Sequence, residues 1–128
     1  MLKLASTTGS VSKVEPFVRK LVSRYNLSPD RQCDILVSLT EAVTNAIVHG
    51  NCRAEDKTVK VRTKQEKGVL ALRVSDEGHG FDFNNLPDPT TPENICKCGG
   101  RGVYLMRQLA DNLRFYNNGS TVEMRFKL

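Results

Sequence analysis

The strongest constraint on the fold of this chain is a long helical pattern between Ser28 and Gly50. Ser28 followed by Pro29 is typical of a helix N-cap and first turn, and Gly50 is typical of a helix end. Within these limits an apolar row recurs every three or four residues, at Leu36, Leu39, Val43 and Ile47. Such spacing predicts an amphipathic helix that buries this row in a core.

The same helix has a second, polar row. Glu41, Asn45 and His49 follow one another at intervals of four, so an α-helix would align them roughly opposite the apolar row. A solvated helix face is the simplest interpretation of Glu41 and Asn45 taken alone. Whether the row has a function therefore depends on other motifs in the chain. For His49 we expect a structural role, in capping or packing.

The rest of the pattern predicts an α+β fold, with helices on one face of a mostly antiparallel sheet. A second helix is expected from a cap at Ser10 or Ser12 to about Tyr25, and a third over 102–111. Strands are predicted at 2–6, 58–65 and 69–76, with Lys67–Gly68 as a hairpin turn. Residues 113–128 predict a terminal hairpin that turns at Asn118–Gly119.

Length and composition indicate one folded domain over residues 1–128. An apolar fraction of 39% and a charged fraction of 26% are typical of a globular protein. No apolar run approaches the roughly 20 residues that span a bilayer, and the start lacks the apolar stretch of a signal peptide. The cysteines at 33, 52, 96 and 98 follow no disulfide or zinc spacing. We therefore expect reduced thiols and a cytoplasmic location, without a membrane partner.

The net charge of +5 raises the question of nucleic-acid binding. The basic residues are scattered along the sequence, with no run and no interleaving with aromatic residues. Such a distribution more often indicates a solvated surface, or attraction to an acidic protein or a nucleotide. We expect no direct nucleic-acid contact.

A first candidate binding motif follows the strand 69–76. Asp76 ends this strand and opens the stretch DEGHGFD, in which Gly78 and Gly80 let the backbone pass close to a ligand. A carboxylate only accepts hydrogen bonds, so it selects a ligand edge that offers donors, such as the amino group of adenine. Taken alone, D-x-G-x-G also occurs in plain turns.

A second candidate lies after a long aperiodic segment, at CGGRGVYL. Gly99, Gly100 and Gly102 stand just before the predicted helix 102–111. Glycines at a helix N-terminus expose N–H groups that bind anions, and the helix dipole adds to the attraction. The pattern therefore indicates phosphate binding, with a glycine-rich linker as the equally frequent alternative.

Together the two motifs give the polar row a function. A nucleotide held at its base by Asp76 and at its phosphates by the glycines needs Mg²⁺, which prefers oxygen ligands. Asn45 offers such an oxygen without adding charge, and Glu41 lies one turn away to accept a proton from an attacking hydroxyl. The three signals in this order favour a nucleotide site over a solvated face.

These residues resemble a known superfamily. TEAVTNAIVHGN (40–51) resembles the N-box of the gyrase, heat-shock chaperone, histidine kinase and mismatch-repair (GHKL) ATPases. DEGHGFD resembles their first glycine box and GGRGVYLMRQLAD their second. DPTTPENICKCGGRGVYLMRQLAD is most similar to the bacterial anti-sigma-factor serine kinases, the RsbW-like group. The resemblance implies a Bergerat fold, a two-layer α/β sandwich, with Mg²⁺ and ATP between the helical layer and a lid at about 77–101.

The resemblance implies roles for the residues that match the first two boxes. Glu41 would be the general base and Asn45 the magnesium ligand. Asp76 would hold the adenine amino group, and Gly78 and Gly80 would shape the adenine pocket.

The second glycine box and the lid receive roles in the same way. Gly100 and Gly102 would present amides to the phosphates, and Gly99 would aid movement of the lid. Lys97 stands near the place where some relatives carry an arginine close to the terminal phosphate. Arg101 would reach either a phosphate or a partner protein.

At the level of function, the resemblance implies an ATP-dependent serine-protein kinase that acts as an anti-sigma factor. Such kinases phosphorylate a serine of a small anti-anti-sigma (STAS-domain) partner, sequester a sigma factor, and commonly form homodimers. The chain has no room for the phosphoacceptor helix of a histidine kinase or the transducer domain of a gyrase-like enzyme. The alternative is a nucleotide-binding switch, or a module that sequesters a partner without kinase activity.

Overall fold

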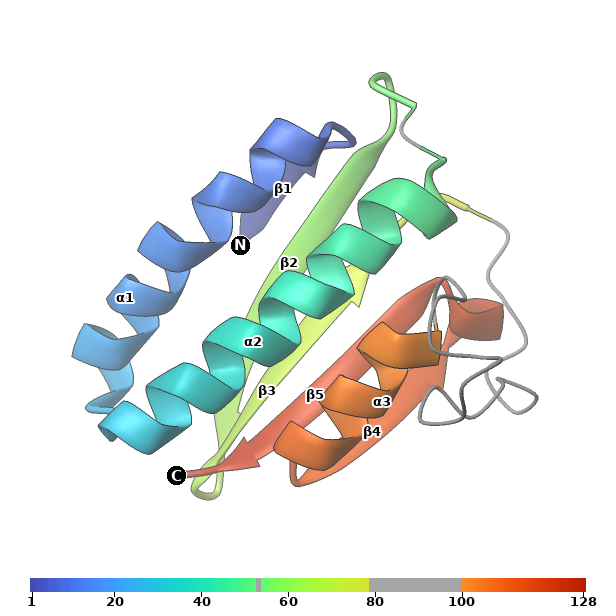
Figure 1. Ribbon diagram of the computed structural model, residues 1–128. Helices are drawn as coiled ribbons and strands as arrows, with labels where there is room; N and C mark the ends of the chain where they lie inside the picture. The colour runs from blue at the N-terminus through green and yellow to red at the C-terminus, as the bar shows by residue number, and fades with distance from the viewer. Residues whose placement is uncertain (53, 79–99) are drawn as a thin grey trace.

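A five-stranded antiparallel sheet forms one layer of the protein (Figure 1). The structure is a computed structural model that describes residues 1–52, 54–78 and 100–128. The strands lie in the order β1-β2-β3-β5-β4, and each neighbouring pair is antiparallel. Their bounds are β1 Leu2–Ala5, β2 Thr58–Glu66, β3 Val69–Ser75, β4 Asn112–Tyr116 and β5 Thr121–Lys127.

Three α-helices of the described residues form the second layer, and all of them cover the same face of the sheet (Figure 1). They are α1 Val14–Tyr25, α2 Pro29–Asn45 and α3 Gly100–Leu109, with short turns η1 Thr8–Lys13, η2 Ala46–Gly50 and η3 Asn117–Gly119. The predicted α+β architecture, with its element order and one-sided helical layer, is therefore confirmed. No helix in the described part of the chain has the length and apolarity needed to cross a membrane.

The long helix begins as its sequence predicts but changes pitch before its expected end. Ser28 Oγ accepts a hydrogen bond from the backbone N–H of Arg31 at 3.2 Å, and Pro29 occupies the first turn. After Asn45 the chain continues as a π-helical turn to Gly50. A π turn bonds residue i to i+5, so it rotates later side chains away from an α-helical row. His49 is exposed, so the expectation that it packs was wrong; it lies in the last turn of η2, and its role in capping stays a prediction.

Two helix starts differ from their predicted positions. The stretch with Ser10 and Ser12 forms the 3₁₀ turn η1, and the cap of α1 falls on Lys13 without a side-chain hydrogen bond. Ser12 Oγ instead donates back to the carbonyl of Gly9 at 2.8 Å. Helix α3 begins at Gly100, two residues earlier than predicted. Gly100 and Gly102 of the second box therefore lie inside the first turn of α3 rather than before it.

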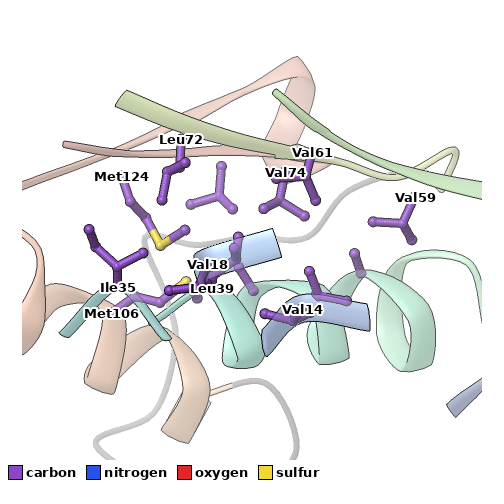
Figure 2. Close-up of a cluster of buried hydrophobic side chains, with 14 of the residues drawn as sticks. Val14, Val18, Ile35, Leu39, Val59, Val61, Leu72, Val74, Met106 and Met124 are labelled. Atoms are coloured by element: carbon purple, nitrogen blue, oxygen red, sulfur yellow. The ribbon is translucent and has the colours of Figure 1, made fainter. Parts of the chain in front are cut away.

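The core lies between the sheet and the helices, as Figure 2 shows. On α2, Ile35 is fully buried and Leu36 only partly, so the buried row is shifted by one residue at its start from the predicted one. Strand residues alternate between this core and the opposite face of the sheet. The labelled core side chains come from α1 (Val14, Val18), α2 (Ile35, Leu39), β2 (Val59, Val61), β3 (Leu72, Val74), α3 (Met106) and β5 (Met124).

The two predicted hairpins are present, with different turns. Lys67 and Gly68 both have positive φ, 51° and 75°, the pattern of a two-residue turn that matches strand twist. The β4–β5 connection is longer than the expected Asn118–Gly119 pair. Asn117 and Asn118 also adopt left-handed backbone, and Ser120 closes the turn with its N–H on the carbonyl of Asn117.

Candidate functional site

The polar row of α2 meets the first turn of α3. Glu41 and Asn45 are partly buried, one helical turn apart, and Gly102 is buried against them. A Cβ atom at Gly102 would lie 2.5 Å from Asn45 Nδ2 and 3.2 Å from Glu41 Oε2. Only glycine therefore lets the backbone of α3 come this close while Asn45 keeps its position.

This meeting places an anion-binding element beside the polar row. The first N–H groups of a helix have no partner within the helix and point outward along the positive end of its dipole. In α3 this end is formed by Gly100 and Gly102, and its first turn contains no acidic residue. The arrangement brings a carboxylate, an amide and a helix N-terminus together, which is the set predicted to act on a nucleotide phosphate.

A second part of the site surrounds Asp76, directly after β3. Its Oδ1 accepts a hydrogen bond from the N–H of Gly78 at 2.8 Å. A Cβ atom at Gly50 would overlap the Asp76 carboxylate, and one at Gly78 would overlap the carbonyl of Gly50. Both glycines are thus required for Asp76 to lie against the end of the α2–η2 helix. The role of Gly50 was missed, because a glycine at that position already has an explanation as a helix end.

Burial sets the electrostatics of Asp76. The loss of water around its carboxylate raises its pKa above the ordinary value of 3.8. The Gly78 N–H and the positive charge of Lys57 oppose this shift without cancelling it. Oδ2 accepts no hydrogen bond from the described residues, and a ligand that donates a hydrogen bond there would offset part of the penalty.

Asn51 is an organising residue that the sequence analysis did not identify. Its side chain is buried, donates to Ser6 Oγ at 2.8 Å and to the Thr58 carbonyl at 3.2 Å, and accepts from the Glu77 N–H at 2.7 Å. It thereby ties the end of η2 to the residue that follows β1, to β2 and to the segment that follows Asp76. Its only sequence signal is its place directly after Gly50, at the end of TEAVTNAIVHGN.

These residues fit a nucleotide with its magnesium ion. Gly102 lets the first turn of α3 lie directly against Asn45 and Glu41, and Asp76 presents an acceptor in a half-buried position. Among the described residues, no three acidic, histidine or cysteine side chains gather to hold a metal ion by themselves. A magnesium ion here would therefore be shared between Asn45 and phosphate oxygens, the usual arrangement for Mg²⁺ with nucleotides.

Several predicted site residues lie outside the described part of the chain. They are Gly80, Lys97 and Gly99, together with most of the proposed lid at 77–101. Gly100 and Arg101 belong to the first turn of α3, although only the backbone of Arg101 is described. Their predicted roles in lid movement and phosphate contact stay predictions.

Comparison with known proteins identifies the family. Residues 4–126 match the model of the histidine kinase-like ATPase domain, which is nearly the whole chain. The chain belongs to this family. As a histidine kinase-like ATPase domain, it has the fold that the N-box and the two glycine boxes predicted.

Individual relatives place this ATPase domain in the RsbW-like group, as predicted. The chain is 33% identical over 111 residues to the serine-protein kinase RsbW of Bacillus subtilis (strain 168), covering 81% of this chain and 69% of the relative. It is 30% identical to RsbW of Bacillus velezensis over 96% of this chain and 81% of the relative. It is 29% identical to an anti-sigma F factor of Clostridium botulinum over 92% and 89%.

Solved structures agree on the fold of this ATPase domain. A histidine kinase domain from the blue-light-activated kinase EL346 of Erythrobacter litoralis superposes with a TM-score of 0.58 at 20% identity. The match covers 90% of this chain, which spans 61% of that domain's chain. A second structure of the same kinase gives a TM-score of 0.56 and is matched over 32% of its length.

Proposed function

We propose that this protein is an ATP-dependent serine-protein kinase and anti-sigma factor. It transfers the terminal phosphoryl group of ATP to a serine of an anti-anti-sigma (STAS-domain) protein and sequesters a sigma factor. One observation above all supports this function: Glu41 and Asn45 lie together against Gly102 in the first turn of α3. The similarity to serine-protein kinases RsbW and to an anti-sigma F factor supports the same assignment.

Each residue of the site has a distinct part in this reaction. Asn45 holds the magnesium ion, which neutralises charge on the phosphates when it is bound. Glu41 accepts the proton of the serine hydroxyl. The serine oxygen bonds to the terminal phosphorus at the same time, and the bond from that phosphorus to ADP breaks. The first-turn amides at Gly100 and Gly102 bind phosphate oxygens.

Asp76 sets the choice of base. Its carboxylate accepts from the exocyclic amino group of adenine, whereas the corresponding carbonyl oxygen of guanine would be repelled by it. Since Asp76 is half-buried, the discrimination takes place where water competes less for the hydrogen bond. We therefore expect ATP to bind much better than GTP.

The test is phosphoryl transfer to a cognate STAS protein. Wild-type protein, Glu41→Gln and the control Glu55→Gln are incubated with labelled ATP, Mg²⁺ and the partner; Glu55 is exposed in the turn before β2. We expect labelled serine with wild type and with the control, and a loss of at least about a hundredfold with Glu41→Gln, as for a removed general base.

Calorimetry with a non-hydrolysable ATP analogue separates this kinase from a binding module. We expect Glu41→Gln to bind the analogue about as well as wild type, since the carboxylate acts only on the transferred proton. Analogue binding by wild type without transfer to any STAS partner would instead support a nucleotide switch. Homodimer formation stays a prediction, which light scattering would measure.

A further inference from the structure

The sheet has a second face that no helix covers in the described part of the chain (Figure 1). Residues that alternate with the core positions of each strand lie on this open face. Its charged members line up across the strands by the observed register. They are the basic residues Lys3, Lys60, Arg62, Lys64, Arg73, Arg114, Arg125 and Lys127, and the acidic residues Glu66 and Glu123.

The open face holds the entire positive excess of the protein. It carries eight of the 19 basic residues and two of the 14 acidic ones, which leaves eleven basic and twelve acidic residues elsewhere. In the sequence these charges are separated by core residues and by long distances along the chain. Basic residues that are scattered along the sequence therefore lie together in the folded protein, because antiparallel pairing gathers them on one surface.

Two cross-strand pairs on this face have like charges directly opposite each other. Lys3 on β1 is paired with Lys60 on β2, and Arg62 on β2 with Arg73 on β3. Such pairs destabilise a sheet by a few tenths of a kcal/mol to about 1 kcal/mol each. Arg73 is compensated by Glu123 on its other side, but the stability of the sheet gives no reason for Lys3, Lys60 and Arg62, whereas binding of a negatively charged partner does.

The charged side chains border a groove with a small apolar floor. The groove has a volume of about 720 Å³. Its floor is formed by Val69 and Ala71 of β3. Long side chains of the two neighbouring strands form its walls, Arg62, Lys64 and Glu66 on β2 and Glu123 and Arg125 on β5.

Two of the guanidinium groups on the open face are bound by a buried carboxylate. The side chain of Glu123 is only 4% exposed and accepts from Arg73 Nε at 2.9 Å and from Arg125 Nε at 3.1 Å. The Arg73 guanidinium also lies 4.5 Å from the centre of the Tyr116 ring. Holding each arginine through Nε leaves its two terminal nitrogens, the pair that binds a carboxylate in a fork geometry. These arginines are ordered before any partner arrives, which lowers the entropy lost on binding.

We propose that the open face binds an acidic polypeptide segment, whose carboxylates pair with the arginines and lysines while small apolar side chains lie on Val69 and Ala71. A nucleic acid fits less well, because its phosphates would leave the apolar floor of Val69 and Ala71 without a matching contact, and the Tyr116 ring is already stacked under Arg73 rather than open to a base. A second copy of this chain would meet the same positive charge. The surface lies on the side of the sheet away from Asp76 and α2, so it does not depend on the proposed kinase activity.

The test measures the affinity for a labelled peptide of alternating glutamate and alanine, by fluorescence anisotropy at low salt. The variant is Arg62→Glu/Lys64→Glu on the groove wall. The control is Lys13→Glu/Lys20→Glu, the same charge change at exposed positions of the helical layer. We expect the wall variant to weaken binding by at least about tenfold and the control by less than about threefold. The wall variant should keep or raise its melting temperature, since it removes the repulsion between Arg62 and Arg73.

Three results would overturn the proposal. Equal losses in the two variants would show attraction to net charge rather than to this face. Tighter binding of a DNA duplex, with the same dependence on Arg62 and Lys64, would make the surface a nucleic-acid site. A dimer of the wild type that the wall variant abolishes would make it a contact between copies.

Discussion

Gly102 of α3 packs against the side-chain amide of Asn45 on α2, so closely that a methyl group on Gly102 would reach within 2.5 Å of Nδ2. This contact joins two sequence boxes that lie more than fifty residues apart. It also explains why a helix begins with glycine at this position, where the intrinsic helix propensity of glycine is about 1 kcal/mol worse than that of alanine.

The first prediction concerns this contact. In Gly102→Ala the added methyl group forces the Asn45 side chain aside, and such a movement is possible without disturbing the backbone. We expect the free energy of unfolding to change by less than about 1 kcal/mol. We expect the dissociation constant for magnesium and ATP to rise at least about tenfold, or about 1.4 kcal/mol, by calorimetry.

A matched control for this variant is Gly9→Ala. A Cβ atom at Gly9 would meet no other atom within 4 Å. We expect nucleotide affinity in this control to equal that of wild type. Equal affinity in Gly102→Ala would show that the Asn45 amide does not contribute to the nucleotide site.

The second prediction concerns nucleotide binding by the variant Asp76→Asn. The asparagine side chain keeps an oxygen for the Gly78 N–H but presents an amino group to the amino group of adenine. We expect ATP affinity to fall by at least about a hundredfold, or about 2.7 kcal/mol. The exposed control Asp56→Asn should bind like wild type. Retained affinity in Asp76→Asn would place the adenine elsewhere.

The third prediction is the pH dependence of the same variant. Because burial raises the pKa of Asp76, its protonated form contributes stability that is fully present below the ordinary value of 3.8. This contribution is lost as the pH rises through the raised folded-state pKa. Asp76→Asn should therefore gain stability relative to wild type across that window, and the gain should then level off. Urea unfolding at a series of pH values measures it, and a gain that is the same at every pH would contradict the assignment.

The fourth prediction concerns Glu123 under the open face. Burial would raise the pKa of this carboxyl, but the hydrogen bonds and charges of Arg73 and Arg125 together lower it below the ordinary value of 4.5. Its stabilising effect is thus present above that value and is lost as the pH falls through the folded-state pKa. We expect the free energy of unfolding of Glu123→Gln to be about 1–2 kcal/mol lower than that of wild type at neutral pH. The loss is no larger because both arginines are partly exposed to water. The difference from wild type should vanish in acid.

The fifth prediction concerns Ser38, which is fully buried on α2. Its hydroxyl has no hydrogen-bond partner in the described part of the chain. Ser38→Ala should raise the free energy of unfolding by about 1 kcal/mol or more, through helix propensity and removal of a buried polar group. Ser23→Ala, exposed on α1, isolates the propensity effect of up to about 0.5 kcal/mol. Equal gains at the two positions would indicate that the Ser38 hydroxyl finds a partner.

Local chemistry explains which parts of the fold were predictable. Some signals depend only on residues close together in the sequence, such as the helix start at Ser28 and Pro29 and the periodic apolar rows. These local signals predicted the helices, the strands and the one-sided packing. The likeness of three boxes also predicted that Glu41, Asn45 and the second glycine box meet. The exact start of α3 was not predictable, because Gly102 is held in the helix by a contact with Asn45 that local propensity does not contain.

Other features depend on contacts across the chain. The need for glycine at position 50 follows from packing against Asp76, twenty-six residues further on. Asn51 has partners in three separate segments, none of which is its neighbour in sequence. The cluster of basic residues on the open face could not be predicted for the same reason, because it forms only when strand pairing places residues such as Arg62 and Arg73 opposite each other.

Strand β3 is common to both surfaces of the sheet. Val74 and the carboxylate that follows at Asp76 belong to the helical side, whereas Ala71 and Arg73 belong to the groove. A ligand on either side of the sheet would thus contact residues of the same strand. Thermodynamic linkage then requires reciprocity: if nucleotide alters the affinity of a groove ligand by some factor, that ligand alters the affinity for nucleotide by the same factor.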